Sequence, residues 1–463
     1  MKRSDITVNK ENGTLVLLTA SWPYGRGETF LESEIPYLTN YFKKVYVLPM
    51  FADGSPRSFD DRITLWPPTP PSAAKPADFF RGIRHSHGMF LPEWKRSHQF
   101  PLSPYGLYLT ARTLGIARRI ENRIISEVTS LSTKTEVREP AASTSTDPER
   151  KDEAGQERIK NRRGMIYSYW MNQASIGAIL AGKKLGWPVI SRVHGGDLYT
   201  ERYPGSFLPW HDWKVRNLNH LLPVSEFGQR YLQERYPDAS SHIKIFRLGV
   251  REPAAYNTNQ TNATHDGPNQ EVPFHMASCS SVIPLKRVNR IMDTALALRK
   301  LWDSNPRFEK RQIHWTHIGH GAGWADLSKR IKNIDLPGLN IRLTGHMPNE
   351  QITSYYLREN VNLLVNYSTS EGIPVSIMEA FSCGIPAAAP HIGGIPEIIN
   401  SSTGILFDPD TEPDKLAQLV DNAVQSEKLT KMGAAAKKKW KKEYHLETNY
   451  RRFMDFLSSI LHS

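Results

Sequence analysis

Short apolar segments, each followed by a turn and a helical segment, recur in both halves of this 463-residue chain, and this rhythm most restricts its fold. The first apolar segment is Thr14–Ala20, which leads through a glycine-bearing turn into an expected helix at residues 30–42 and then into Lys44–Met50. A buried strand, a helix and a second parallel strand form a βαβ unit. We therefore expect an α/β fold built on parallel sheets.

The same pattern continues along the chain. A helix is expected at Ala174–Leu185. The further strands that apolar runs predict are Pro188–Val193, His220–Val224, Ile243–Leu248, Phe274–Val282, Gln312–Ile318, Ile341–Thr344, Val361–Tyr367 and Gly404–Phe407. Strands that alternate with helices in this way are typical of doubly wound sheets, which bind ligands beyond the carboxyl ends of their strands.

The length of the chain predicts two domains of roughly 200 residues each. A polar, Asn-rich stretch at residues 257–270 has the composition of a linker between them. We expect a first domain at 1–250, a linker at 251–272, a second domain at 273–440 and a terminal segment at 441–463. Residues 131–163 have few large apolar side chains, which predicts a mobile insertion or an exposed helix.

The composition narrows the cellular setting. The only two cysteines, Cys279 and Cys383, are far apart in sequence, which argues against a disulfide framework and is typical of a reducing compartment. No signal peptide or transmembrane segment is evident, so we expect a cytoplasmic protein.

The formal net charge of +12 favours anionic partners. Part of it lies in the run Lys437–Lys442, which includes Trp440. Two interpretations stay open for this run: a solvated helix face, or a peripheral contact with an anionic membrane at the inner face of the cell membrane. No nucleic-acid recognition motif is evident, so no nucleic-acid partner is expected.

The most specific motif lies at residues 368–399, where an apolar strand precedes a loop and a helix at Val375–Ser382. Gly372 lets the backbone approach a ligand, and Pro374 suits the start of the helix. The free N–H groups at that helix end would favour a diphosphate. Glu371 and Glu379 can accept hydrogen bonds from sugar hydroxyls, although two solvated glutamates would have the same spacing.

The whole block, with Gly393 and Gly394 following, closely resembles the donor-site signature of glycosyltransferase family 4, the group 1 glycosyl transferases. The resemblance implies a GT-B fold: two Rossmann-like domains facing across a cleft, with a C-terminal helix that crosses back to the first. It also implies a donor domain in the second half that binds a nucleoside-diphosphate sugar. The donor residues implied by the resemblance are Glu371, Gly372, Ile373, Pro374, Val375 and Glu379.

Two further segments of the second half resemble family segments. Lys286 matches a lysine that binds the donor phosphates, but Ser281 stands where the family has an arginine. Either Arg287 replaces that arginine, or the site lacks one of the family's two cations. The turn that contains Gly345 and Met347 resembles the family's contact with the nucleobase.

The first half resembles the family's acceptor-side domain. His194 and Asp197 match a His-Gly-x-Asp segment, in which the histidine places the donor sugar or the acceptor and the aspartate orients it. Gly25, Arg26 and Gly27 resemble the family's glycine loop beside the donor phosphates. The alternative for His194 is a structural histidine held by backbone groups. The alternative for the loop with Gly25 and Gly27 is a plain strand-to-helix turn. We expect Glu371 and His194 to be the catalytic residues.

The resemblance implies a retaining, metal-independent glycosyltransferase of the hexosyltransferase type, with a saccharide or lipid-linked saccharide as acceptor. No cofactor beyond the nucleotide-sugar co-substrate is expected. The sequence Asp408-Pro409-Asp410 matches a metal-binding D-x-D pattern but has the composition of a turn, so no metal is expected. The alternatives are a GT-B epimerase or phosphorylase and a non-catalytic nucleotide-sugar-binding protein.

Overall fold

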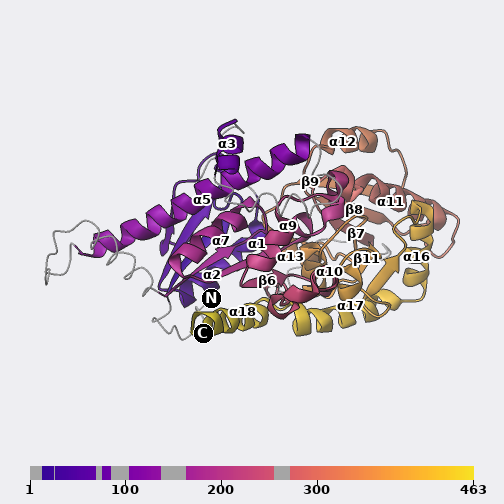
Figure 1. Cartoon of the computed structure of the whole chain (residues 1–463). Helices are drawn as coiled ribbons and strands as arrows, with labels where there is room; N and C mark the ends of the chain where they lie inside the picture. Colours follow the sequence, from indigo (N-terminus) through magenta and orange to yellow (C-terminus); the bar gives the residue numbers. More distant parts are fainter. Residues whose placement is uncertain are drawn as a thin grey trace, which may run out of the picture. The chain divides into compact units, whose positions relative to one another are not determined.

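The structure is a computed structural model that describes residues 13–25, 27–68, 76–84, 104–136, 163–254 and 272–462. The chain divides into two compact units (Figure 1). The first comprises Met1–Val224, Gly228–Phe246 and Tyr450–Ser463, and the second comprises Ser225–Phe227 and Arg247–Asn449. Most of the linker expected at 251–272 lies outside the described residues.

The first unit contains a six-stranded parallel sheet in the order β3-β2-β1-β4-β5-β6. The strands are β1 (Thr14–Thr19), β2 (Lys44–Pro49), β3 (Ile63–Leu65), β4 (Gly164–Ser168), β5 (Val189–Val193) and β6 (His220–Pro223). In β1 the residues from Leu15 to Leu18 are at most 1% exposed, as expected for a central strand covered on both faces. Leu15 pairs with Val45 on one side and Met165 on the other.

In the described part of this unit the helices are α1 (Thr29–Glu32), α2 (Ile35–Tyr41), α3 (Pro76–Arg84), α5 (Pro104–Glu136), α7 (Gln173–Leu185), α8 (Gly195–Leu198), α9 (His211–Asn217) and, from Gly228 onward, α10 (Glu226–Arg235). Short 3-10 turns lie at Thr200–Arg202, Pro204–Ser206 and Pro237–His242. The first six residues of the insertion expected at 131–163 belong to α5, and residues 137–162 lie outside the described part.

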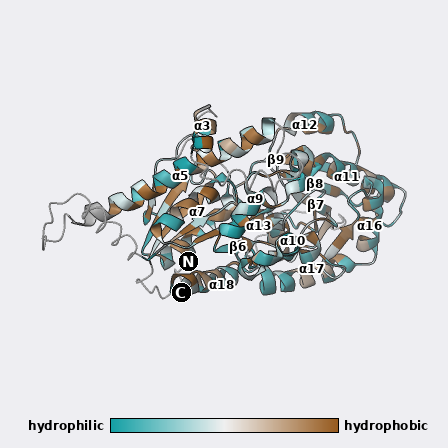
Figure 2. Cartoon of the chain, in the orientation of Figure 1, coloured by the Kyte–Doolittle hydropathy of each residue, from teal (hydrophilic) through white to brown (hydrophobic). Residues whose placement is uncertain are grey.

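The long helix α5 was not anticipated from the sequence, and it packs on the shorter α3. The contact is close, because a Cβ atom on Gly82 would lie 1.8 Å from the carbonyl oxygen of Ala111, and one on Gly115 would lie 1.8 Å from that of Asp78. Figure 2 shows hydrophobic and hydrophilic residues alternating along α5, as expected for a helix with one packed face.

The single helix expected at residues 30–42 is wrong, because the chain forms α1 and α2 with a break at Ser33–Glu34. Pro36 lies in the first turn of α2, where its missing N–H group is tolerated, but it cannot continue a preceding helix. Glu34, in the break, is completely buried and forms an ion pair of 3.0 Å with Arg192 of β5.

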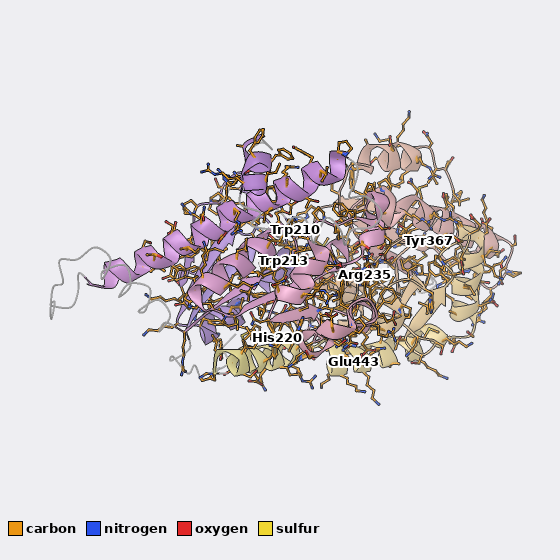
Figure 3. The ribbon with its side chains drawn as sticks, viewed as in Figure 1. Trp210, Trp213, His220, Arg235, Tyr367 and Glu443 are labelled. Carbon is orange, nitrogen blue, oxygen red and sulfur yellow. The ribbon has the colours of Figure 1, made fainter. Side chains whose placement is uncertain are left out.

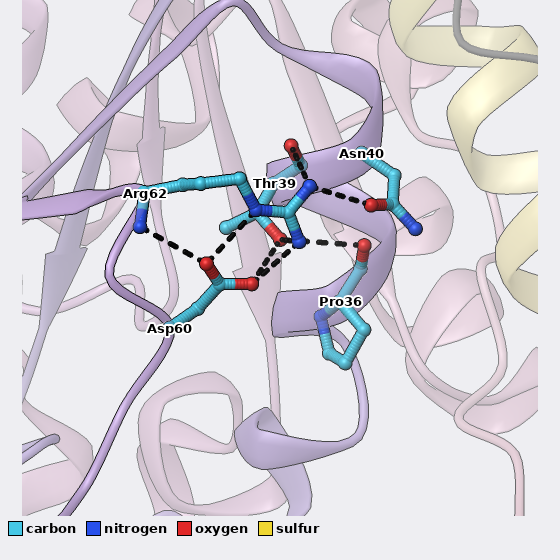
Figure 4. Close-up of polar contacts among 5 residues, drawn as sticks. All are labelled: Pro36, Thr39, Asn40, Asp60 and Arg62. Carbon is cyan, nitrogen blue, oxygen red and sulfur yellow. Dashed lines mark hydrogen bonds and ion pairs between the residues drawn. The ribbon is translucent and has the colours of Figure 1, made fainter. Parts of the chain in front are cut away.

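A polar cluster ties α2 to the loop before β3 (Figure 4). Arg62 Nη2 donates to Thr39 Oγ1 at 2.9 Å and to Asp60 Oδ2 at 2.5 Å, and its Nη1 donates to Asn40 Oδ1 at 2.7 Å. The hydrogen bonds from Arg62 hold the pKa of Asp60 well below its ordinary value. This cluster fastens an edge strand to the helix beside it.

The strand expected at Ile243–Leu248 is also wrong. Only an isolated bridge between Leu221 and Ile243 forms, although the N–H groups of Lys244 and Phe246 still donate to β6. Trp210, which is labelled in Figure 3, precedes α9 directly. It is fully buried, and its Nε1 donates to the Thr110 carbonyl of α5 at 2.9 Å.

The second unit repeats the strand order of the first, with the sheet β12-β11-β10-β7-β8-β9. Its strands are β7 (Phe274–Cys279), β8 (Ile313–Ile318), β9 (Leu339–Gly345), β10 (Leu363–Val365), β11 (Ala387–Pro390) and β12 (Gly404–Phe407). Strands β7 and β10 are shorter than expected, since β7 ends at Cys279 and β10 comprises only Leu363–Val365. Both sheets have the Rossmann order, so the expectation of two Rossmann-like domains is confirmed.

Helices and short helical turns surround this sheet. In the described part of this unit they are the 3-10 turn Pro284–Lys286, the π-helical turn Trp440–Tyr444 and the helices α11 (Val288–Asp303), α12 (Trp324–Lys332), α13 (Asn349–Arg358), α14 (Val375–Ser382), α15 (Ile395–Ile398), α16 (Pro413–Gln425), α17 (Lys428–Lys439) and the start of α18 (Leu446–His462). No helix within the described ranges is both long and apolar enough to cross a membrane.

The C-terminal helix α18 returns to the first unit from Tyr450 onward, as expected. Tyr450 stacks on Tyr37 with ring centroids 5.2 Å apart, and Phe453 contacts the rings of Tyr167 and Phe246. Trp440 is only 1% exposed, and its Nε1 donates to the Val250 carbonyl. The indole of Trp440 is therefore not exposed on the lysine run.

Candidate functional site

In the second unit, the strand order reverses between β7 and β10, and two predicted site residues meet there. Lys286 lies in the 3-10 turn after β7, and Glu371 lies in the loop after β10. Their side chains form an ion pair with 2.5 Å between Nζ and Oε1. The side chains are 21% and 11% exposed, so both remain accessible to a small ligand. Ligands of doubly wound folds bind at this reversal.

The glycine pair at Gly393 and Gly394 holds the loop that carries Glu371. A Cβ atom on Gly393, whose φ is +50°, would lie 2.1 Å from the Glu371 carbonyl oxygen. The N–H of Gly394 donates to the Gly372 carbonyl at 2.9 Å. Only glycines permit this close approach, which gives the second glycine motif of the sequence a physical role.

The rest of the motif forms the start of α14. Ile373 is buried, Pro374 is the N-cap, and Val375 is the first helical residue. Proline offers no side-chain acceptor at the N-cap, so it does not cap the first N–H groups of the helix. These N–H groups and the helix dipole favour an anion at this end.

Glu379 lies in the second turn of α14 and is 6% exposed. Burial raises the pKa of its carboxyl to about 8. A carboxyl this buried is favoured in its ionised form only when hydroxyl or N–H donors reach it. Such a group has the chemistry expected of a ligand contact, as ribose hydroxyls would provide.

The structure does not bring Arg287 to the Lys286–Glu371 pair. Arg287 has a φ of +46°, and its Nη1 donates to the Pro409 carbonyl at 2.9 Å. The guanidinium therefore supports the Asp408-Pro409-Asp410 turn, in which the N–H of Asp410 donates to Asp408 Oδ1 at 2.9 Å. This turn was expected from the sequence.

No cluster of three or more potential metal-ligating side chains occurs in the part of the chain that the structure describes. The base-contacting turn was expected at Gly345 and Met347. Gly345 ends β9 with a φ of +71°, and its carbonyl accepts the N–H of Gly319 at 2.8 Å. Met347 follows as a half-buried residue. The two glycine turns after β8 and β9 are thus joined.

In the first unit, the strand order reverses between β1 and β4, and a glutamate that the sequence did not reveal lies there. The carboxylate of Glu28 accepts the backbone N–H groups of Ala20, Ser21 and Trp22 at 2.9, 2.7 and 2.7 Å. It also accepts Trp170 Nε1 at 2.6 Å. Each carboxylate oxygen accepts two donors, so Glu28 joins the loop after β1 to the residues after β4.

The glycine loop after β1 contains three predicted residues. Gly25 has a φ of +64°, which a side chain would strain. The carbonyl of Gly27 accepts Arg57 Nη2 at 2.8 Å. Arg26 lies outside the described residues.

His194 follows β5, and aromatic rings surround its imidazole. The ring centroids of Trp170, Tyr169 and Phe30 lie 4.4, 5.2 and 5.6 Å away. Burial, together with the charge of Arg192, lowers the pKa of His194 to about 3, so the ring is neutral at physiological pH. Neither ring nitrogen hydrogen-bonds to any described residue.

Asp197 orients His194 through the backbone and not through the imidazole, which corrects the expected contact. Its Oδ1 accepts the N–H of His194 at 2.6 Å, and its Oδ2 accepts that of Met171 at 2.6 Å. Burial raises the pKa of Asp197 to about 7, against the opposing effect of these N–H groups and of Lys214. The aspartate thus connects the ends of β4 and β5.

The sequence also did not reveal Asn366, whose Nδ2 donates to Glu371 Oε1 at 3.2 Å. The available signal for it was its place near the end of the apolar run 361–367, in which it is one of two asparagines. For Glu28, the signal was an acidic residue after a glycine loop, which is common in turns and carries little information.

Residues 276–440 match the family described as "Glycosyl transferases group 1". Among curated proteins, the chain is similar to the amylovoran biosynthesis glycosyltransferase AmsK of Erwinia amylovora. The two are 27% identical over 276 residues, which is 58% of this chain and 62% of AmsK. The putative colanic acid biosynthesis glycosyltransferase WcaL of Escherichia coli is 21% identical over 58% of this chain and 63% of its own length. The chain thus spans less than two thirds of these relatives.

Solved structures match over almost the whole chain. The complex of Anabaena Alr3699/HepE with UDP has a TM-score of 0.57 and 14% identity, covering 96% of this chain and 100% of that one. The apo form of the lipopolysaccharide outer core galactosyltransferase WaaB has a TM-score of 0.59 and 14% identity, covering 96% and 99%. At such identities the likeness establishes the fold. The match to the glycosyl transferases group 1 family thus lies within residues 276–440, and the fold of the chain is GT-B.

Proposed function

We propose that this protein is a retaining glycosyltransferase that moves a sugar from a nucleoside-diphosphate sugar to an acceptor hydroxyl. The observation that carries the proposal is the Lys286–Glu371 pair at the strand-order reversal of the second unit, beside the start of α14. A cation, an accessible carboxylate and free helical N–H groups together suit a sugar linked to a diphosphate.

Each donor group has a separate task in this proposal. Lys286 and the N–H groups at the start of α14 bind the diphosphate, and the carboxylate of Glu371 accepts hydrogen bonds from the transferred sugar. Glu379 accepts the ribose hydroxyls, and Gly345 and Met347 border the base. Arg287 acts indirectly, because its guanidinium supports a neighbouring turn.

In the reaction, the acceptor oxygen forms a bond to the anomeric carbon on the face from which the diphosphate leaves. The bond between that carbon and the phosphate oxygen breaks, and its electron pair goes to the leaving diphosphate. The acceptor proton passes to a phosphate oxygen. Lys286 and the start of α14 stabilise the negative charge that develops, so neither a metal nor a covalent intermediate is needed.

The first unit supplies the acceptor side. A neutral His194 can accept a hydrogen bond from a hydroxyl group or donate one, and the aromatic rings around it exclude water. Gly25 and Gly27 allow close approach of a ligand to the loop after β1, and Asp197 fixes the backbone of His194.

We further propose a saccharide or lipid-linked saccharide acceptor and a role in polysaccharide synthesis, since AmsK and WcaL are named for amylovoran and colanic acid biosynthesis. For a cytoplasmic enzyme of this kind, the exposed Lys437, Lys438, Lys441 and Lys442 can contact anionic lipid headgroups. With Trp440 buried, such a contact would be electrostatic, and co-sedimentation with anionic vesicles should weaken as the salt concentration rises.

The test of the function is release of nucleoside diphosphate from a panel of nucleotide sugars, in the presence and absence of saccharide acceptors. UDP-glucose is the first donor to try, because a structure of HepE contains it. The anomeric configuration of the product, read by NMR, tests retention, and an assay with a chelator tests metal independence. Lys286→Ala should abolish diphosphate release, whereas Lys329→Ala, on the exposed part of α12, should leave it unchanged.

The same assays separate the alternatives. A nucleotide-sugar-binding protein would bind the donor without releasing diphosphate. An epimerase would convert the sugar without transferring it to the acceptor, and a phosphorylase would require inorganic phosphate.

A further inference from the structure

Asn366 lies between β10 and Glu371, and its position is tightly defined. It is 7% exposed, and its backbone N–H donates to the Ala388 carbonyl of β11 at 2.9 Å. Its side-chain Oδ1 accepts the N–H of Ser368 at 2.8 Å. This bond to the residue two positions ahead is an Asx turn, which shapes the loop toward Glu371.

The Asx turn also determines which way the amide group faces. A backbone N–H can only donate, so the atom that faces Ser368 must be the Oδ1 acceptor. The NH₂ group of Asn366 therefore faces the other way, toward Glu371 Oε1 at 3.2 Å. Lys286 Nζ reaches the same oxygen at 2.5 Å.

Two donors thus hold Oε1 of Glu371, while the glycine pair at Gly393 and Gly394 holds its backbone. No hydrogen bond from the described residues reaches Oε2. We propose that Asn366 is a positioning residue: with Lys286 it fixes the rotation of the Glu371 carboxyl, so that Oε2 is presented to the transferred sugar. This inference rests on the proposed function of Glu371.

The short carboxamide of Asn366 meets both requirements at this position. Aspartate keeps the acceptor for Ser368 and preserves the turn, but it places a second carboxylate against Glu371. Leucine has a similar shape and neither accepts nor donates. Of these three side chains, which have similar shapes, only asparagine can accept from the backbone and donate to a carboxylate at the same time.

The test compares Asn366→Asp with a matched control in the same unit, Asn400→Asp. Asn400 Oδ1 also accepts an N–H two residues ahead, from Ser402 at 3.0 Å, and Asn400 has no bond to a carboxylate among the described residues. We expect Asn366→Asp to lower kcat at pH 8 by about 10- to 100-fold, the usual effect of losing one hydrogen bond to a charged group. Asn400→Asp should stay within about twofold of the wild type.

Two further measurements separate positioning from a merely structural role. Free nucleoside diphosphate lacks the sugar, so its affinity by isothermal titration should be the same in Asn366→Asp and the wild type. The deficit in kcat should also shrink as the pH falls. At low pH a proton can be shared between the carboxyl introduced by Asn366→Asp and the carboxyl of Glu371, and this restores the hydrogen bond. Lys286 is the charged group that contacts Glu371.

Equal kcat for Asn366→Asp and Asn400→Asp at every pH would overturn the inference. Loss of nucleoside-diphosphate binding together with a lower melting temperature would overturn it as well, by showing that Asn366 merely maintains the loop. A wild-type protein that releases no diphosphate from any donor would instead contradict the proposed function, so the two failures are distinguishable.

Discussion

The two units have the same strand order, yet the glutamates at their strand-order reversals are used in opposite ways. In the first unit, Glu28 accepts four N–H donors, and both of its oxygens are occupied. In the second unit, Glu371 is bound at Oε1 alone and pairs with Lys286. A carboxylate saturated by backbone and indole donors stabilises the fold, whereas one with an accessible oxygen beside a cation can exchange its partners for a ligand.

The buried titratable groups differ as well. In the first unit, burial keeps His194 neutral, while Asp197 is satisfied by backbone N–H groups. In the second, burial favours the protonated form of Glu379, and no described residue hydrogen-bonds to its carboxyl. The comparison predicts that donor recognition depends on the charges of the second unit, and that the first unit contributes a neutral polar group and loop geometry.

The largest effect is expected from Glu371→Gln, which keeps the shape but removes the charge. We expect kcat/KM for donor turnover to fall by about 100- to 1000-fold, as for the loss of a preorganised charged group. The measurement is release of nucleoside diphosphate. The control Glu350→Gln, at an exposed position of α13, should have no effect. An active Glu371→Gln would remove the distinction between the two glutamates.

Next in size is His194→Gln, for which we expect kcat to fall by about 100-fold, while the affinity for free nucleoside diphosphate is kept. Because the pKa of His194 is about 3, its protonation should not affect the wild-type rate between pH 5 and 8. The control is His242→Gln, because the imidazole of His242 hydrogen-bonds to the Val215 carbonyl of the first unit. Loss of diphosphate binding in His194→Gln would assign the histidine to the donor phosphates.

A moderate effect is expected from Glu379→Gln, with the KM for the donor raised about 10-fold. The pKa of about 8 lies above the ordinary 4.5, so the folded protein holds a proton that the unfolded chain releases between pH 4.5 and 8. The contribution of this group to the free energy of unfolding therefore decreases as the pH rises through that window. Glu379→Gln should raise the melting temperature at pH 8 and change it little at pH 4.5, which calorimetry can check.

Glu28→Gln is expected to have the smallest effect on turnover of these variants. Its main effect is expected on the stability of the fold. Glutamine cannot accept all four donors, so we expect a loss of about 1–3 kcal/mol in unfolding free energy with only a several-fold fall in kcat. Glu32→Gln, which breaks a partly exposed ion pair with Arg57, should cost less than about 1 kcal/mol. If Glu28→Gln were stable but inactive, Glu28 would belong to the site.

The pattern of apolar runs and glycine turns was enough to predict parallel sheets in both halves, although β3, β4 and β11 were not among the expected strands. The starts of β1, β2 and β12 agree with the runs, because a buried parallel strand must be continuously apolar. Where local signals competed with tertiary contacts, the predictions were wrong: the 30–42 helix breaks at the buried Glu34–Arg192 pair, and Ile243–Leu248 forms no continuous ladder.

The sequence by itself determined the fold class and the group 1 motif that contains Glu371, since these depend on periodicity and on short, local spacing. The tertiary structure alone decided which groups meet: Lys286 with Glu371 across 85 positions, and Glu28 with Trp170 across 142. It also decided that Arg287 turns away and that Trp440 is buried. The physical reason is that hydrogen-bond partners and burial depend on side chains brought together from distant strands, which no local pattern encodes.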